Sequence, residues 1–286
     1  MAEKIMLWNN SKKSYIKPFL LNDGQVHPAV LIIPGGGYQC VCEPAEGEPI
    51  AKMFNKLGLH AFVLVYRVYP DIFPAPQQDA MRAMKIIRTN AGKWNINANA
   101  VGVCGFSAGG HLGASLGTSI TENVDASNND EFDKASHRPD FMILCYGVLS
   151  FRDDLASDSE SAQHLLGHEK AANIKLEYSP DFCVTEKTPP CFIWHTVKDQ
   201  MVDYKCSIYF AQSLAAKNIP FELHLFPFGV HGMLQGLDTP DISIWPELAC
   251  KFIAVHCGEI KIDSDCYTHV YQCCAENSRP GPLREE

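Results

Sequence analysis

Six short runs of apolar, β-rich residues recur along the chain, and they limit its possible folds more than any other feature. Most of the runs are apolar throughout rather than alternating with polar residues, which is typical of strands buried on both faces. Helical patterns separate them, so we predict an α/β fold with a mostly parallel central sheet and helices on both faces. The runs are AVLIIP (29–34), AFVLVY (61–66), AVGVCG (100–105), FMILCY (141–146), CFIWHT (191–196) and FELHLF (221–226).

The segments between the runs carry apolar residues at helical spacing. The first, EGEPIAKMFNKLG, has Pro49 near its start and Gly58 as its stop. The predicted helices cover 46–58, 77–91, 204–217 and 244–256, and a further helix begins near Ala108.

Length and composition favour one domain followed by a short tail. The chain has 286 residues, of which 46% are apolar, enough for one sizeable core. We predict a single α/β domain over 1–257 and a peripheral or disordered tail over 258–286. Residues 151–187 interrupt the strand–helix rhythm at the carboxyl end of the sheet, where sites form in open α/β folds. We expect this insertion to cap a pocket.

The net charge and the lack of a long apolar run argue against nucleic-acid and membrane partners. A formal net charge of -9 repels phosphate backbones, so we expect no nucleic-acid partner. No apolar run approaches the roughly 18 residues of a membrane span, and we expect no membrane partner. The first twenty residues lack the apolar core and cleavage site of a signal peptide, so we expect a cytoplasmic protein. The sequence leaves the oligomeric state open.

The chain contains twelve cysteines, and none forms a C-x-x-C pair. Cys104, Cys145 and Cys191 lie in or beside apolar runs and are interpreted as small buried hydrophobes. We expect free thiols, as in a reducing compartment, and no bound metal or cofactor. The five late cysteines follow no zinc-ligand spacing: Cys250, Cys257, Cys266, Cys273 and Cys274.

The segment GFSAG, residues 105–109, matches the G-x-S-x-G pattern in which a strand turns sharply into a helix around a serine. Side chains at Gly105 and Gly109 would collide with neighbouring backbone in such a turn. The turn strains the backbone of Ser107 and holds its hydroxyl in front of the sheet. The pattern therefore predicts Ser107 as a nucleophile, although a glycine-rich helix start could also arise from close packing alone.

A serine hydroxyl needs a base, and in folds with this turn the acid and then the histidine follow the serine along the chain. His231 lies after the last apolar run, between two glycines in FPFGVHGM, where it can reach Ser107. We predict His231 as the base. His111, one helical turn beyond Ser107, is interpreted as a packing residue, and His195 as a core or pocket-wall residue.

Two aspartates follow the run CFIWHT. Asp199 lies directly past its end, in VKDQMV, and 32 positions before His231, which leaves room for one helix and one strand. Asp203 lies equally well placed to cap the next helix. We favour Asp199 as the acid that fixes the imidazole tautomer, with Asp203 as the alternative.

The glycines of PGGGY, residues 34–38, end the first apolar run. Consecutive glycines let backbone N–H groups approach a substrate oxygen, and the N–H of Ala108 is a second source of such donors. The alternatives are a plain turn or a phosphate cradle. Neither G-x-G-x-x-G nor a Gly-Lys-Ser/Thr ending follows, which argues against a nucleotide site.

Six blocks, in this order, resemble α/β-hydrolase esterases of the acetyl xylan esterase-like type. The resemblance covers most of 28–252. The blocks are IPGGGY, EGEPIA, GFSAGGHL, RPDFMILCYGVLS, TPPCFIWHTVKDQMV and FPFGVHGM.

The resemblance implies a serine hydrolase that removes acetyl groups from xylan-derived sugars and small esters without a cofactor. This sequence departs from the pattern at Asp203 and Gly147, where similar sequences tend to carry proline, and in its cysteine-rich tail. By position, the resemblance assigns Ser107 as nucleophile, Asp199 as acid, His231 as base, and Gly36, Gly37 and Ala108 as the oxyanion hole.

Aromatic faces suit sugar rings or acyl chains, so Tyr38, Trp194 and Trp245 are predicted pocket walls, although the tryptophans could equally belong to the core. Glu43 and Glu46 could bind sugar hydroxyls, but acids at a helix start are commoner.

Together these features predict an esterase acting on small-molecule or oligosaccharide esters through an acyl-enzyme. A general short-chain carboxylesterase or a serine peptidase is the alternative within the class. A non-catalytic binding module on the same fold is the alternative outside it.

Overall fold

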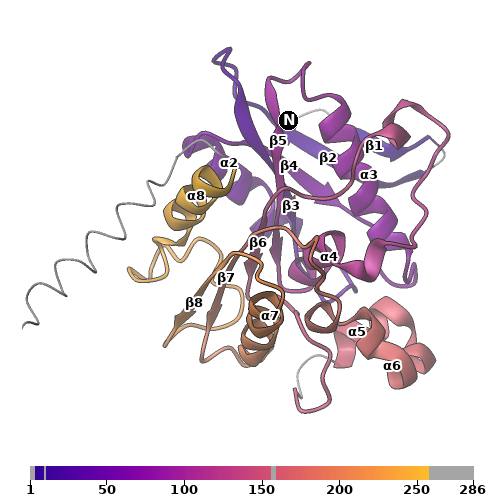
Figure 1. The fold of residues 1–286 in the computed structure, drawn as a ribbon, viewed down its shortest axis with the longest axis vertical. Helices are drawn as coiled ribbons and strands as arrows, with labels where there is room; N and C mark the ends of the chain where they lie inside the picture. Colours follow the sequence, from indigo (N-terminus) through magenta and orange to yellow (C-terminus); the bar gives the residue numbers. More distant parts are fainter. Residues whose placement is uncertain (1–3, 10, 156–158, 258–286) are drawn as a thin grey trace, which may run out of the picture.

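The computed structural model describes residues 4–9, 11–155 and 159–257. Its centre is an eight-stranded sheet in the order β1-β2-β4-β3-β5-β6-β7-β8 (Figure 1). The strands from β4 to β8 pair in parallel, which confirms the predicted mostly parallel α/β fold. The strands are β1 Ile5–Trp8, β2 Ser11–Phe19, β3 His27–Ile33, β4 His60–Val65, β5 Ile96–Phe106, β6 Met142–Cys145, β7 Cys191–Thr196 and β8 Phe221–Phe226.

Two antiparallel strands, β1 and β2, precede the parallel part and were not predicted. β2 reads SKKSYIKPF, and only Ser14 and Ile16 within it are buried. A strand near the edge of a sheet keeps much of its surface in water, so it tolerates lysines that a central strand would exclude. The uniformly apolar pattern that identified the central strands is therefore absent here.

Five of the helices correspond to predicted segments, with one correction. The predicted helix 46–58 begins later, as α2 at Glu48, and Glu46 instead ends the separate short helix α1; a side chain at Gly47, between the two helices, would overlap the carbonyl oxygen of Glu43. The helices are α1 Glu43–Glu46, α2 Glu48–Lys56, α3 Ala75–Thr89, α4 Ala108–Gly117, α5 Ser159–Leu166, α6 His168–Ile174, α7 Lys205–Ala216 and α8 Trp245–His256.

The helices cover both faces of the sheet, as predicted (Figure 1). On one face, α3, α4 and α7 bury Met84, Leu112 and Phe210 in the larger core cluster. On the other face, α2 and α8 bury Phe54 and Phe252 in a second cluster. The sheet lies between two apolar layers, which explains why its central strands are apolar on both sides.

The predicted insertion at 151–187 contains α5 and α6, followed by two short 3₁₀ turns at Lys175–Tyr178 and Pro180–Phe182. The tail predicted over 258–286 lies outside the described residues, so its character and the proposed single-domain division stay predictions. Within the described ranges, none of the helices has both the length and the apolar character needed to cross a bilayer.

Cys104, Cys145 and Cys191 are buried thiols in the strands of the sheet, which confirms their interpretation as core residues. Burial raises the pKa of the Cys145 and Cys191 thiols. Of the late cysteines, Cys250 and Cys257 lie on or beside α8, and the other three lie outside the described residues.

Candidate active site

Ser107 stands at the junction of β5 and α4 with φ 53° and ψ −121°, a conformation that L-residues rarely adopt. A side chain at Gly105 would overlap the carbonyl oxygen of Gly109, and one at Gly109 would overlap that of Ile33. The steric reason inferred for the flanking glycines is therefore confirmed. Their small size lets the helix start directly behind the strand and holds Ser107 out from the sheet.

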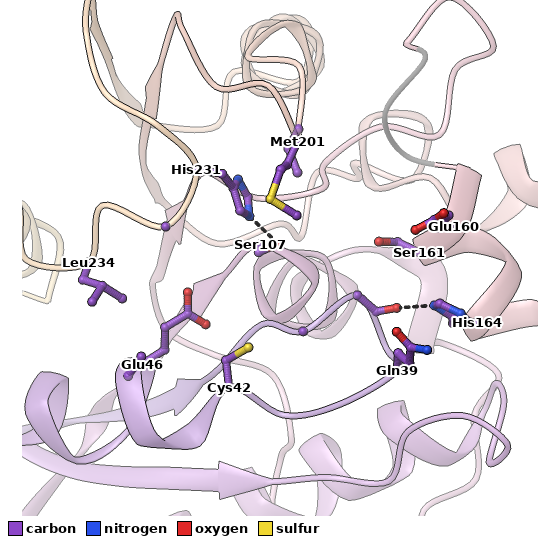
Figure 2. A pocket seen from close by; sticks show the side chains of 15 residues that line it. Gln39, Cys42, Glu46, Ser107, Glu160, Ser161, His164, Met201, His231 and Leu234 are labelled. Carbon is purple, nitrogen blue, oxygen red and sulfur yellow. Dashed lines mark hydrogen bonds between the residues drawn. The ribbon is translucent and has the colours of Figure 1, made fainter.

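The three predicted triad residues lie in one hydrogen-bonded chain. Ser107 Oγ lies 2.9 Å from His231 Nε2, and His231 Nδ1 lies 2.6 Å from Asp199 Oδ2 (Figure 2). Because the carboxylate only accepts, Nδ1 carries the proton and Nε2 of a neutral ring is left to accept from Ser107. This tautomer is the one that can withdraw a proton from the serine.

The structure places Asp199, and not Asp203, against the His231 ring. Asp203 instead accepts the backbone N–H of Lys205 at the start of α7, 2.9 Å away, and its carboxylate lies 3.7 Å from the Lys205 ammonium group. Asp203 thus lies at the start of α7, but the N-cap position predicted for it is occupied by Tyr204, one residue later.

Asp199 receives four donors. Its Oδ1 accepts the backbone N–H groups of Met201 and Val202 at 2.8 and 3.0 Å, and its Oδ2 accepts from His195 Nε2 at 3.2 Å as well as from His231. Burial alone would raise the pKa of Asp199. Hydrogen bonds from His195, His231 and Val202 outweigh it and hold the pKa well below its usual range.

The carbonyl groups of the glycine loop after β3 accept hydrogen bonds from other parts of the protein. The Gly36 carbonyl accepts from the N–H groups of Gln39 and Cys40, and Gly36 and Gly37 have φ of 123° and 61°. Among the backbone hydrogen bonds outside helices and strands in the described residues, none uses the N–H of Gly36, Gly37 or Ala108. Gly36 and Gly37 line the cavity beside Ser107, whereas Ala108 begins α4 and is not among the lining residues, so the assignment of these three N–H groups to an oxyanion hole stays a prediction.

Glu46 is a buried carboxylate behind this loop. Its Oε2 accepts the N–H of Gly35 at 2.6 Å, and its Oε1 accepts the hydroxyl of Tyr146 at 3.0 Å. Burial raises the pKa of Glu46, although both hydrogen bonds act in the opposite direction. Glu43, the other acid considered, pairs with Lys17 at 2.8 Å and does not line the cavity.

The prediction that Tyr38, Trp194 and Trp245 form pocket walls is wrong. All three side chains are fully buried, and none lines the cavity beside Ser107. Trp194 and Trp245 stack on each other in the core cluster under α8, with ring centroids 5.6 Å apart. The Tyr38 hydroxyl lies 2.7 Å from His111 Nδ1.

His111 and His195 are buried, which confirms their interpretation as packing or core residues. His111 is buried between Tyr38 and the carbonyl of Tyr178, and burial lowers its pKa to about 4, as suits a packing residue. His195 is also buried and belongs to the core. Its contact with Asp199 was not foreseen.

A cavity of about 460 Å³ opens beside Ser107 and His231. Figure 2 shows Leu234, Glu46 and Cys42 on one side of Ser107 and a group of polar side chains on the other. Sequence reasoning missed that polar group and Met201, because no motif marks them. The expectation that residues 151–187 cap a pocket was the one signal that indicated α5. The polar residues are Gln39, Glu160, Ser161 and His164.

In the part of the chain that the structure describes, no three side chains of histidine, cysteine, aspartate or glutamate gather in a way that could hold a metal ion.

Comparisons with known proteins show the family and the fold of the chain. The BD-FAE family matches residues 20–214. An acetyl ester-xyloside bifunctional hydrolase from Caldicellulosiruptor lactoaceticus has 36% sequence identity and a TM-score of 0.79, over 88% of this chain and 95% of that one.

Two curated relatives are longer proteins. Endo-1,4-beta-xylanase B of Butyrivibrio fibrisolvens is 38% identical over 77% of this chain, and an acetylxylan esterase of Xylanibacter ruminicola is 33% identical over 71% of it. This chain spans only 34% and 40% of their respective lengths. From its matched residues and its fold, the chain belongs to the BD-FAE family and is an α/β-hydrolase of the acetyl xylan esterase-like type.

Proposed function

We propose that this protein is a serine esterase that hydrolyses short acyl esters, chiefly acetyl esters, of plant cell-wall carbohydrates such as acetylated xylo-oligosaccharides. The observation that carries the proposal is the hydrogen-bonded chain from Ser107 through His231 to Asp199 at a strained strand–helix turn. The names of the related acetylxylan esterase and acetyl ester-xyloside hydrolase support the choice of substrate class.

In the proposed first step, His231 Nε2 takes the proton of Ser107 Oγ as that oxygen bonds to the ester carbonyl carbon. The carbonyl oxygen becomes an oxyanion, which the N–H groups of Gly36, Gly37 and Ala108 stabilise. When the bond to the alcohol breaks, the imidazolium gives its proton to the departing oxygen. An acyl group is then left on Ser107.

In the second step, water replaces the alcohol. His231 Nε2 takes a proton from the water as its oxygen attacks the acyl carbon, and the proton returns to Ser107 Oγ when the carboxylic acid leaves. Asp199 keeps its negative charge throughout, orients the ring and stabilises the imidazolium. Its hydrogen-bond donors favour this ionised state.

The test is acetate release from acetylated xylo-oligosaccharides, compared with aryl esters of increasing acyl length. We expect turnover of the acetylated sugars and a fall in kcat/KM beyond about four acyl carbons. Ser107→Ala should lower kcat by at least about 10⁴-fold, because no other group can form the acyl-enzyme. Ser136→Ala is the control, since Ser136 is an exposed loop serine.

The carboxylesterase and the binding-module alternatives each have their own outcome. Turnover of short aryl esters without turnover of acetylated xylo-oligosaccharides would make the protein a general short-chain carboxylesterase. A preference for acyl chains longer than about four carbons would contradict the acetyl assignment. If the protein turned over no ester between about pH 6 and 9, the binding-module interpretation would replace the proposal.

A further inference from the structure

We propose that the sugar portion of the ester binds on the side of the cavity formed by α5 and the glycine loop, and that the acyl group binds on the opposite side. This inference rests on the proposed function and assigns a place to each half of the substrate. We call the first half the α5 side, defined by Gln39, Glu160, Ser161 and His164, and the second half the acyl side, defined by Cys42, Ala45, Glu46 and Leu234.

The two sides lie on either side of Ser107. Figure 2 shows the α5-side residues together, with α5 approaching the glycine loop, while Leu234 and Cys42 lie beyond Ser107 in the opposite direction. An ester bound with its carbonyl carbon at Ser107 extends in two directions. Each half of the cavity therefore receives one half of the substrate.

The α5 side offers hydrogen-bonding groups that a sugar can use. His164 Nδ1 donates to the carbonyl of Gly37 at 2.9 Å, so Nε2 of the neutral ring remains as an acceptor. Ser161 adds a hydroxyl, Glu160 a carboxylate and Gln39 an amide. Gln39 and Glu160 are exposed, and Ser161 and His164 are half-buried, so sugar hydroxyls can replace water at these groups.

An aromatic ring lies beside His164, although Tyr69 itself is not among the residues that line the cavity. The Tyr69 ring centroid is 5.7 Å from that of His164. Tyr69 is 47% exposed, whereas large aromatic side chains are usually buried. Its backbone N–H donates to the Tyr38 carbonyl at 2.8 Å, which ties it to the glycine loop. A sugar ring has polar edges and an apolar C–H face, so an exposed ring next to hydrogen-bonding groups matches both.

The acyl side suits a short, apolar group. Leu234 and Ala45 present only carbon, and both carboxylate oxygens of Glu46 already accept hydrogen bonds from Gly35 and Tyr146. A methyl group placed on the α5 side would instead displace water from polar groups and return no hydrogen bond, which is unfavourable. The division of polar and apolar groups thus sets the orientation of the ester.

Two substrates with the same acyl group test this orientation: acetylated xylotriose, and ethyl acetate, which has no sugar. Acetate release is measured for both with the full chain and with Glu160→Ala and Tyr69→Ala. We define the ratio as kcat/KM for acetylated xylotriose divided by kcat/KM for ethyl acetate. Each variant should lower this ratio about 3- to 10-fold, mainly through a higher KM for the xylotriose ester, because one contact to the sugar is lost.

Glu169→Ala is the matched control. Glu169 is an exposed glutamate on the neighbouring helix α6 and does not line the cavity, so this variant should keep the wild-type ratio. Thermal unfolding midpoints identify any variant that fails to fold, and for such a variant Glu160→Gln and Tyr69→Leu repeat the comparison.

Equal losses on both substrates would overturn the sugar subsite, and so would a changed preference between acetyl and butyryl esters without a changed ratio. A wild-type protein that releases acetate from ethyl acetate but not from acetylated xylotriose would instead refute the proposed substrate class, and the subsite with it.

Discussion

Two buried carboxylates flank the candidate site, and they are held in opposite ways. Asp199, in the loop after β7, receives four hydrogen bonds, and they hold its pKa well below the usual range. Glu46, at the end of α1, receives two, and burial raises its pKa. Burial opposes charge in both places. Asp199 has more donors and is less deeply buried than Glu46, and together these two differences favour its negative charge.

The difference separates two tasks. A carboxylate that must stabilise an imidazolium needs to stay ionised throughout the reaction, and the donor set of Asp199 secures that state. Glu46 touches the glycine loop rather than the imidazole, through the N–H of Gly35. We infer that its contribution is to hold the loop from which Gly36 and Gly37 present their N–H groups.

The largest effect is expected from removing the charge of Asp199. Asp199→Asn should lower kcat by about 10⁴-fold, because an amide that donates to His231 Nδ1 favours the wrong imidazole tautomer. Steady-state rates on an acetyl ester measure this loss. Asp203→Asn is the matched control, four residues further along the same loop, and should stay within about 3-fold of the wild type. A larger loss at Asp203 than at Asp199 would reverse the assignment of the acid.

A smaller effect is expected at Glu46. Glu46→Ala removes the acceptor of the Gly35 N–H, so the glycine loop loses its anchor and kcat should fall about 10- to 100-fold with little change in KM. Glu46→Gln keeps both contacts, since its amide oxygen can accept from Gly35 and its NH₂ can donate to Tyr146, and should recover most of the rate. If the glutamine variant were as slow as the alanine variant, the charge of Glu46, rather than its hydrogen bonds, would be required.

The parts of the site that sequence reasoning located are those fixed by sterics and chain order. Ser107 is marked because only small residues fit around a strand–helix turn, and Gly105 and Gly109 meet that need at named backbone atoms. Asp199 and His231 are marked because each follows a recognisable strand. Chain order left Asp203 open, and only the geometry of the loop separates the two acids.

The parts that sequence reasoning missed depend on side-chain direction or on irregular segments. Trp194 and Trp245 are aromatic whether they face a ligand or a core, and here both belong to the core cluster on the α2 and α8 face of the sheet. Glu160 and His164 reach the cavity because of how α5 packs against the glycine loop, and the sequence of the insertion carries no periodic signal for that packing. β2 escaped notice because its lysines are solvated.

The smallest effect is expected from substituting His195. The substitution removes a donor from Asp199 and so makes its surroundings more like those of Glu46. His195 Nε2 faces two acceptors, Asp199 Oδ2 and the Val202 carbonyl at 3.1 Å, so it carries a proton, and its Nδ1 lies 2.9 Å from Ser207 Oγ. His195→Leu removes one of the four donors of Asp199. We expect kcat/KM to fall about 3- to 10-fold.

The pH profile separates this positioning role from a merely structural one. Without the His195 N–H, more negative charge remains on Asp199 Oδ2 and faces His231, which favours the protonated imidazole. The acidic limb of the kcat/KM profile should therefore move to higher pH in His195→Leu. His195→Gln, whose NH₂ can donate in the same direction, should move it back. A lower unfolding midpoint with an unchanged pH profile would mean that His195 supports the fold alone and that the other three donors suffice to hold Asp199.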